Sequence, residues 1–194
     1  MPSKTEEYLA LAQRTANGLT RYWESWTDYL TTASRLYKYP FADQLMIYAQ
    51  RPDATACADY DVWNSRMNRY VRRGAKGIAL LDESSGFSRL HYVFDVSDTG
   101  VRRNSRDPDM WQLGPDLVQP VSEMLAREYG VQQENLGQQI ADICGRLVDS
   151  YWDNNSGDIL DIVDGSLLMG YDEAGQEFQF KSAAAISITY AVLE

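Results

Sequence analysis

The segment YPFADQLMIYAQRPDATACADYDVWNSRMNRYVRRGAKGIALLD, from Tyr39 to Asp82, decides the fold of this chain. Residues 41–50 repeat apolar side chains at helical spacing, which predicts a short helix, and residues 59–67 predict another. A basic stretch with two glycines follows and predicts a tight turn. Residues 78–81 are apolar on both faces of an extended chain, which predicts a central β-strand. Helices and strands therefore occur together in one α+β domain.

The flanking sequence extends this pattern in both directions. Residues 4–17 and 22–36 show helical spacing of apolar residues and predict two helices before the segment. Residues 89–96 predict a second strand, which a turn at 84–86 makes antiparallel to the first. Residues 97–114 are polar and rich in proline and aspartate, which predicts a long loop.

The last third of the chain is predicted to be helical. The expected organisation is an α+β core at 1–114, in which helices surround a small antiparallel β-sheet, and an acidic helical bundle at 115–194 packed on it. The interval 170–180 predicts a small hairpin within the bundle. The predicted helices of this part cover residues 118–129, 135–152, 159–168 and 183–193.

Charge is distributed unevenly along the sequence. The net charge of the chain is −10, yet residues 60–110 hold 9 basic and 7 acidic residues, whereas residues 111–194 hold 3 basic and 14 acidic ones. A polyanion is therefore expected to contact the middle of the chain and not its acidic end.

Composition and motifs exclude several classes of function. No run of about eighteen apolar residues is present, so no membrane span is expected and the predicted location is the cytoplasm. One histidine and two cysteines do not form a conventional zinc site. No nucleotide-binding loop or catalytic triad occurs, so neither an enzyme nor a cofactor is predicted.

Five cations lie within eleven residues, and two glycines accompany them. Gly74 and Gly77 allow the backbone to approach a phosphate closely, while the cations neutralise its charge. The alternative is an ordinary solvated turn before a strand. The five cations are Arg66, Arg69, Arg72, Arg73 and Lys76.

Aromatic and amide side chains accompany this basic stretch. Tyr60, Tyr70 and Tyr92 are candidates to stack on unpaired bases, because tyrosine combines an aromatic face with a polar edge. Trp63 is assigned to the core. Gln50 is a candidate to hydrogen-bond a sugar or phosphate, although it could equally cap a helix.

The central block resembles the N-terminal single-stranded-DNA-binding domain of ArdC-type antirestriction proteins. It is most similar to the version that begins large helicase and methylase proteins of conjugative elements. One position departs from the family pattern, because Asn68 stands where glycine is usual; asparagine tolerates the left-handed conformation. The matching positions are Ala49, Gln50, Pro52, Ala54 and Thr55, then Tyr60 and Trp63, then residues 69–78, and finally Phe94, Asp95 and Val96.

The resemblance implies non-catalytic binding of single-stranded DNA with little sequence preference. It also implies a mobile-element setting, conjugative or phage-borne, with downstream helicase or methylase domains as further partners. The alternative is an anti-defence or docking module that binds a protein through its acidic helices, with Asp158, Asp161 and Asp164 as candidates. A third alternative is an enzyme whose active site needs domains absent from this sequence.

Overall fold

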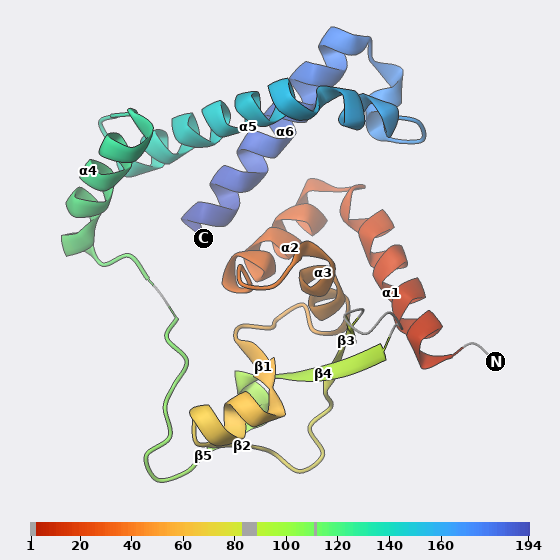
Figure 1. The fold of residues 1–194 in the computed structure, drawn as a ribbon, viewed down its shortest axis with the longest axis vertical. Helices are drawn as coiled ribbons and strands as arrows, with labels where there is room; N and C mark the ends of the chain where they lie inside the picture. Colours follow the sequence, from red (N-terminus) through yellow and green to blue (C-terminus); the bar gives the residue numbers. More distant parts are fainter. Residues whose placement is uncertain (1–2, 83–88, 111) are drawn as a thin grey trace. The chain divides into compact units, whose positions relative to one another are not determined.

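The computed structural model describes residues 3–82, 89–110 and 112–194 and has an α+β fold, as the sequence predicts (Figure 1). Chain contacts divide it into two compact units, Met1–Trp111 (unit 1) and Gln112–Glu194 (unit 2). The turn predicted at 84–86 lies outside the described residues. Within the described ranges, no helix is both long enough and apolar enough to cross a membrane.

Three helices form the first part of unit 1: α1 (Lys4–Leu19), α2 (Trp23–Arg35) and α3 (Phe41–Gln50). The first begins at a capping box, in which Ser3 and Glu6 each bond the other's backbone N–H, and this satisfies two donors that a helix end leaves free. The apolar stripes of the helices meet in the core, whose buried members include Leu19, Tyr29, Leu30, Met46 and Ile47.

The main sheet of unit 1 has three antiparallel strands in the order β1-β4-β3. They are β1 (Cys57–Asp59), β4 (Arg89–Asp95) and β3 (Ile78–Asp82). The antiparallel pairing of β3 with β4 confirms the predicted hairpin strands. The central position predicted for the first strand is wrong, because β4 lies between the other two. The sequence analysis missed β1, because a three-residue strand is too short to show an alternating pattern.

A second, two-stranded sheet pairs β2 (Arg69–Val71) with β5 (Thr99–Val101). The long loop predicted over 97–114 is therefore wrong in its first part, which holds β5 and a short 3₁₀ turn, η2 (Val96–Asp98). The helix predicted over 59–67 is shorter and includes a π-helical turn, η1 (Val62–Arg66).

Unit 2 is helical and contains two long helices. The helix predicted over 135–152 continues to Asp161, because Asn154, Asn155 and Gly157 do not interrupt the backbone bonding. The separate helix predicted over 159–168 is wrong, since only its first three residues belong to α5 and its end forms a 3₁₀ turn. The hairpin predicted over 170–180 is wrong, since Asp172 caps a helix there by accepting a bond from the Gly175 N–H. The elements are η3 (Pro115–Leu117), α4 (Val118–Tyr129), α5 (Leu136–Asp161), η4 (Leu167–Gly170) and α6 (Glu173–Leu193).

Candidate nucleic-acid interface

Residues 72–77, which we call the basic turn, connect β2 to β3. The Ala75 N–H donates to the Arg72 carbonyl over 3.0 Å, and Gly74 has φ +88°. A positive φ at the third position of a turn is the type II geometry, which favours glycine. Arg73 and Lys76 are exposed, and no ion pair between described residues involves either of them.

Gly77 brings the end of the basic turn against two aromatic rings. A Cβ added to Gly77 would lie 3.1 Å from the Cβ of Tyr92 and 3.2 Å from the Cζ of Phe94. The missing side chain therefore allows β3 to approach both residues closely. The end of the basic turn therefore lies next to the face of the sheet that carries Tyr92.

The tyrosines predicted to stack on bases, Tyr60, Tyr70 and Tyr92, are all exposed, with fractions of 51%, 43% and 42%. Tyr92 is on β4, and its neighbour Val93 is buried, as strand alternation requires. Asp59 and Val93 form the last pair of the β1–β4 ladder. Tyr60 is the residue after Asp59, and Tyr92 is the residue before Val93. The pairing therefore brings Tyr60 and Tyr92 to the same end of the β1–β4 ladder.

Tyr70 belongs to the smaller sheet and already has partners in the folded chain. It lies opposite Gly100, where any Cβ would overlap its ring, so the ring covers this glycine. The Arg102 guanidinium carbon is 5.7 Å from the ring centroid, within the range of a cation–π contact. Tyr70 is thus exposed but held in place.

The left-handed conformation inferred for Asn68 is confirmed, with φ +51°. Its side chain donates to the Arg103 carbonyl, and its own carbonyl accepts a bond from the Ser105 hydroxyl. Asparagine therefore takes the place of glycine before β2 and also anchors the chain that follows β5.

Arg69 does not belong to the exposed surface. It is 7% exposed; its Nε donates to Thr99 Oγ1 over 2.7 Å, and its Nη1 pairs with Asp107 Oδ1 at 2.5 Å. Strand alternation explains this, because Tyr70 and Arg69 are consecutive and must point to opposite faces. The phosphate contact predicted for Arg69 is therefore replaced by a structural role, which holds β2 against β5.

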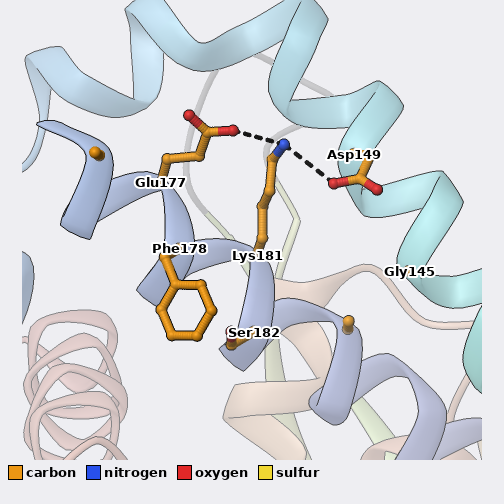
Figure 2. A pocket seen from close by; sticks show the side chains of 8 residues that line it. Gly145, Asp149, Glu177, Phe178, Lys181 and Ser182 are labelled. Atoms are coloured by element: carbon orange, nitrogen blue, oxygen red, sulfur yellow. Dashed lines mark ion pairs between the residues drawn. The ribbon is translucent and has the colours of Figure 1, made fainter.

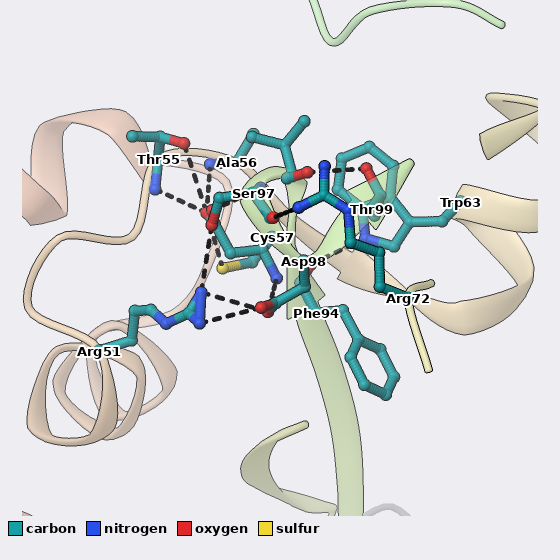
Figure 3. Close-up of polar contacts among 12 residues, drawn as sticks. Arg51, Thr55, Ala56, Cys57, Trp63, Arg72, Phe94, Ser97, Asp98 and Thr99 are labelled. Carbon is teal, nitrogen blue, oxygen red and sulfur yellow. Dashed lines mark hydrogen bonds and ion pairs between the residues drawn. The ribbon is translucent and has the colours of Figure 1, made fainter. Parts of the chain in front are cut away.

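The other predicted arginines differ in whether their guanidinium groups are already bonded within the fold. Arg72 is exposed, and its Nη1 donates to the Ser97 carbonyl over 2.9 Å, which leaves its other donors to a ligand (Figure 3). Arg66 is exposed at the end of η1, and no ion pair in the described part of the chain involves it. Nearby, Arg51 is committed to a two-point pair with Asp98 at 2.9 and 3.2 Å.

Asp95 is the buried acceptor that fixes the end of the sheet. Its Oδ2 accepts the backbone N–H of Thr55 at 2.8 Å and of Ala56 at 3.0 Å, and its Oδ1 accepts that of Ser97 at 2.9 Å. Burial favours a higher pKa, but the Ser97 hydroxyl, which donates to Oδ1 at 2.6 Å, and these backbone donors hold the pKa of Asp95 below its usual value. Burial, reinforced by Asp95, raises the pKa of the Cys57 thiol to about 12.

Gln50 is used inside the fold, contrary to its predicted contact with a nucleic acid. Its Nε2 donates to the Ala79 carbonyl at 2.8 Å, and its Oε1 accepts the Ala79 N–H at 2.9 Å. The amide thereby replaces a neighbouring strand at the outer edge of β3 and blocks that edge. Gln50 therefore has a structural role and is not part of the candidate interface.

The sequence analysis did not predict the roles of two residues in this region. Phe94 matched the family pattern only as part of a strand end, yet its ring contacts Gly77 and points away from the polar network (Figure 3). Arg102 looked like a loop cation, yet it bonds the Asn64 side chain at 2.8 Å and covers Tyr70. Of these two roles, only that of Phe94 could have been predicted, from the alternation of side chains along its strand.

An ion-pair network connects the two long helices of unit 2. Lys181 on α6 pairs with Glu177 at 2.7 Å and with Asp149 of α5 at 3.0 Å, which joins the two helices (Figure 2). Asp158 and Asp161 are exposed near the end of α5. Among the described residues, no group of His, Cys, Asp or Glu is arranged to hold a metal ion.

Comparison with protein-family models, curated proteins and solved structures finds no match for this chain.

Proposed function

We propose that unit 1 binds single-stranded DNA with little sequence preference. The proposal depends on one observation: Gly77, the last residue of the basic turn, contacts Tyr92 and Phe94. The turn that carries Arg73 and Lys76 thereby lies next to aromatic residues that can stack on unpaired bases, and cations with aromatic rings are the combination that single-strand-binding grooves use. Duplex DNA offers no unstacked base to these rings, so single strands are the preferred ligand.

Each side chain of the interface has a distinct role in this proposal. Arg73 and Lys76, aided by Arg72, bind phosphates, and each good stack on Tyr92 or Tyr60 contributes about 1–3 kcal/mol. Because neither stacking nor phosphate contact reads base edges, sequence preference is weak. Binding needs no bond to be made or broken, so the proposed role is not catalytic.

The resemblance of residues 39–82 to ArdC-type domains supports a particular biological setting. We place this binding in the cytoplasm, as a module of a conjugative or phage-borne protein that carries helicase or methylase domains further along its chain. Delivery of a single strand to such domains requires a site that tolerates all sequences.

The test is a fluorescence-anisotropy titration of the full chain with single- and double-stranded oligonucleotides at two salt concentrations. We expect saturable, salt-sensitive binding of the single strand. Replacing Arg73 and Lys76 with alanine should weaken binding about tenfold and lower the slope of log K against log salt by about 1.4, since each lost phosphate contact contributes about 0.7 for single strands. The matched control is the same double replacement at Lys4 and Arg14 on α1, both exposed. Equal affinity in the two double variants would remove the basic turn from the interface.

A second candidate function, docking of a protein partner, is favoured by exposed apolar side chains on α6. They are Phe178, Ile186, Ile188 and Val192. In this alternative the acids Asp158, Asp161 and Asp164 select a basic partner. Reversing the charges of Asp158, Asp161 and Asp164 would abolish such docking and leave DNA binding intact.

A further inference from the structure

The connector between α2 and α3 carries a second exposed pairing of cation and aromatic rings. Tyr37 is 69% exposed and Phe41 is 63% exposed. The Lys38 Nζ lies 5.5 Å from the centroid of the Tyr37 ring. We call these three residues the connector patch. Lone exposed aromatics are common on proteins, but an exposed ring with a lysine beside it has the chemistry of the basic turn and Tyr92.

The connector patch stands on a rigid support. Leu36 is buried at its start, and the Tyr39 N–H bonds the Leu36 carbonyl at 2.8 Å. The Gln44 Nε2 donates to the carbonyls of Leu36 at 3.1 Å and Tyr39 at 3.0 Å. Because the backbone is already fixed, a ligand that binds Tyr37 has little loop entropy to overcome.

The connector also adjoins the sheet that carries Tyr92. The Tyr39 hydroxyl donates to the Cys57 carbonyl on β1 at 2.9 Å. Burial raises the pKa of Tyr39 well above its usual value, so this hydroxyl keeps its proton. Across the sheet the order is therefore basic turn and β3, then β4, then β1, then connector. Two strand spacings, about 10 Å, separate β3 from β1.

From this continuity we infer that the single strand does not end at the sheet but continues onto the connector patch. Tyr37 stacks on a further base, and Lys38 binds its phosphate. This inference rests on the proposed function and adds to it a length requirement: a short oligonucleotide occupies only the basic turn and the sheet, whereas a longer one gains the connector patch.

The experiment compares oligothymidines of about 4 and about 16 nucleotides, the range of site sizes in compact single-strand-binding domains. The full chain is titrated as wild type and as the Tyr37→Ala/Lys38→Ala variant, whose two side chains are exposed and outside the core. We expect the variant to bind the short oligonucleotide as wild type does and to lose about tenfold in affinity for the long one.

The matched control is Tyr22→Ala, because Tyr22 has the same exposed fraction, 69%, but lies at the opposite end of α2. It should leave both affinities unchanged. Unchanged affinity of the connector variant for the long oligonucleotide would overturn the inference, as would an equal loss for both lengths. Absence of wild-type binding at either length would instead overturn the proposed function, and the extension with it.

Discussion

Arg69 and Arg73 are four positions apart and were expected to do the same work, yet the structure treats them in opposite ways. Arg69 is buried on β2 and occupied by Thr99 and Asp107. Arg73 is exposed in the basic turn, where no ion pair between described residues holds it. The difference shows that a count of cations overstates the charge that a ligand can use, since a strand commits every second side chain to its inner face.

The same contrast divides the whole region into an inner framework and an outer face. The framework consists of polar groups that satisfy one another: Gln50 with Ala79, Arg51 with Asp98, and Asp95 with three backbone donors. The outer face consists of cations and tyrosines that remain accessible. Changes in the framework should therefore lower the free energy of unfolding but not the affinity for DNA. Changes on the outer face should lower the affinity for DNA.

The largest effect is expected at Asp95. Asp95→Ala leaves the backbone N–H groups of Thr55, Ala56 and Ser97 without their part-buried acceptor, which costs about 4 kcal/mol of unfolding free energy. Denaturant unfolding followed by circular dichroism measures it. A loss below about 1 kcal/mol would contradict the framework role.

The acid dependence of unfolding gives a second readout for Asp95. Its pKa in the fold is lower than the usual 3.8, so its charged form stabilises the fold fully above that usual value. This contribution is lost as the pH falls through the folded pKa. Asp95→Asn should lack that part of the acid dependence, and an identical pH profile in the two proteins would contradict the assignment.

A smaller loss of stability is expected at Arg69. Arg69→Ala removes the buried bond to Thr99, at a cost of about 2 kcal/mol. The pair with Asp107 adds little, because that carboxylate is 85% exposed. Affinity of the folded variant for single-stranded DNA should stay within about twofold of wild type. Loss of DNA affinity with an unchanged free energy of unfolding would assign Arg69 to the outer face and contradict its structural role.

The smallest change, one of affinity, is expected at Tyr92. Tyr92→Ala removes the stacking ring, so the single-strand affinity of the folded variant should fall about tenfold. Tyr129→Ala is the matched control, since Tyr129 on α4 is 43% exposed, close to the 42% of Tyr92. Equal binding by the two variants would exclude Tyr92 as a stacking residue.

Local signals predicted the elements that are long or sharply bounded. The helices over 118–129 and 41–50 have the predicted limits, and the capping box at Ser3 and the turn at Gly74 follow from residue types alone. The three-residue strands β1 and β5 were missed because so short a segment has no periodicity. Their partners are distant in sequence, which local patterns do not record.

The candidate interface was predictable to a similar degree. Exposure of the tyrosines and of Arg73 and Lys76 agrees with the sequence analysis, as does the burial of Trp63. The structural roles of Gln50 and Arg69 were missed, because each depends on a partner about thirty or more positions away. No single-residue property distinguishes a glutamine that binds sugar from one that closes a sheet edge.

Composition and short-range spacing were enough to predict the class of fold, the tight turn at Gly74 and the concentration of cations between residues 66 and 76, whereas the conformation of Asn68 was expected only from the family resemblance. Only the tertiary structure decided which of those cations remain accessible and which rings they adjoin. That outcome depends on β1 and β5 pairing with distant strands, and such pairing fixes the direction of every side chain along them.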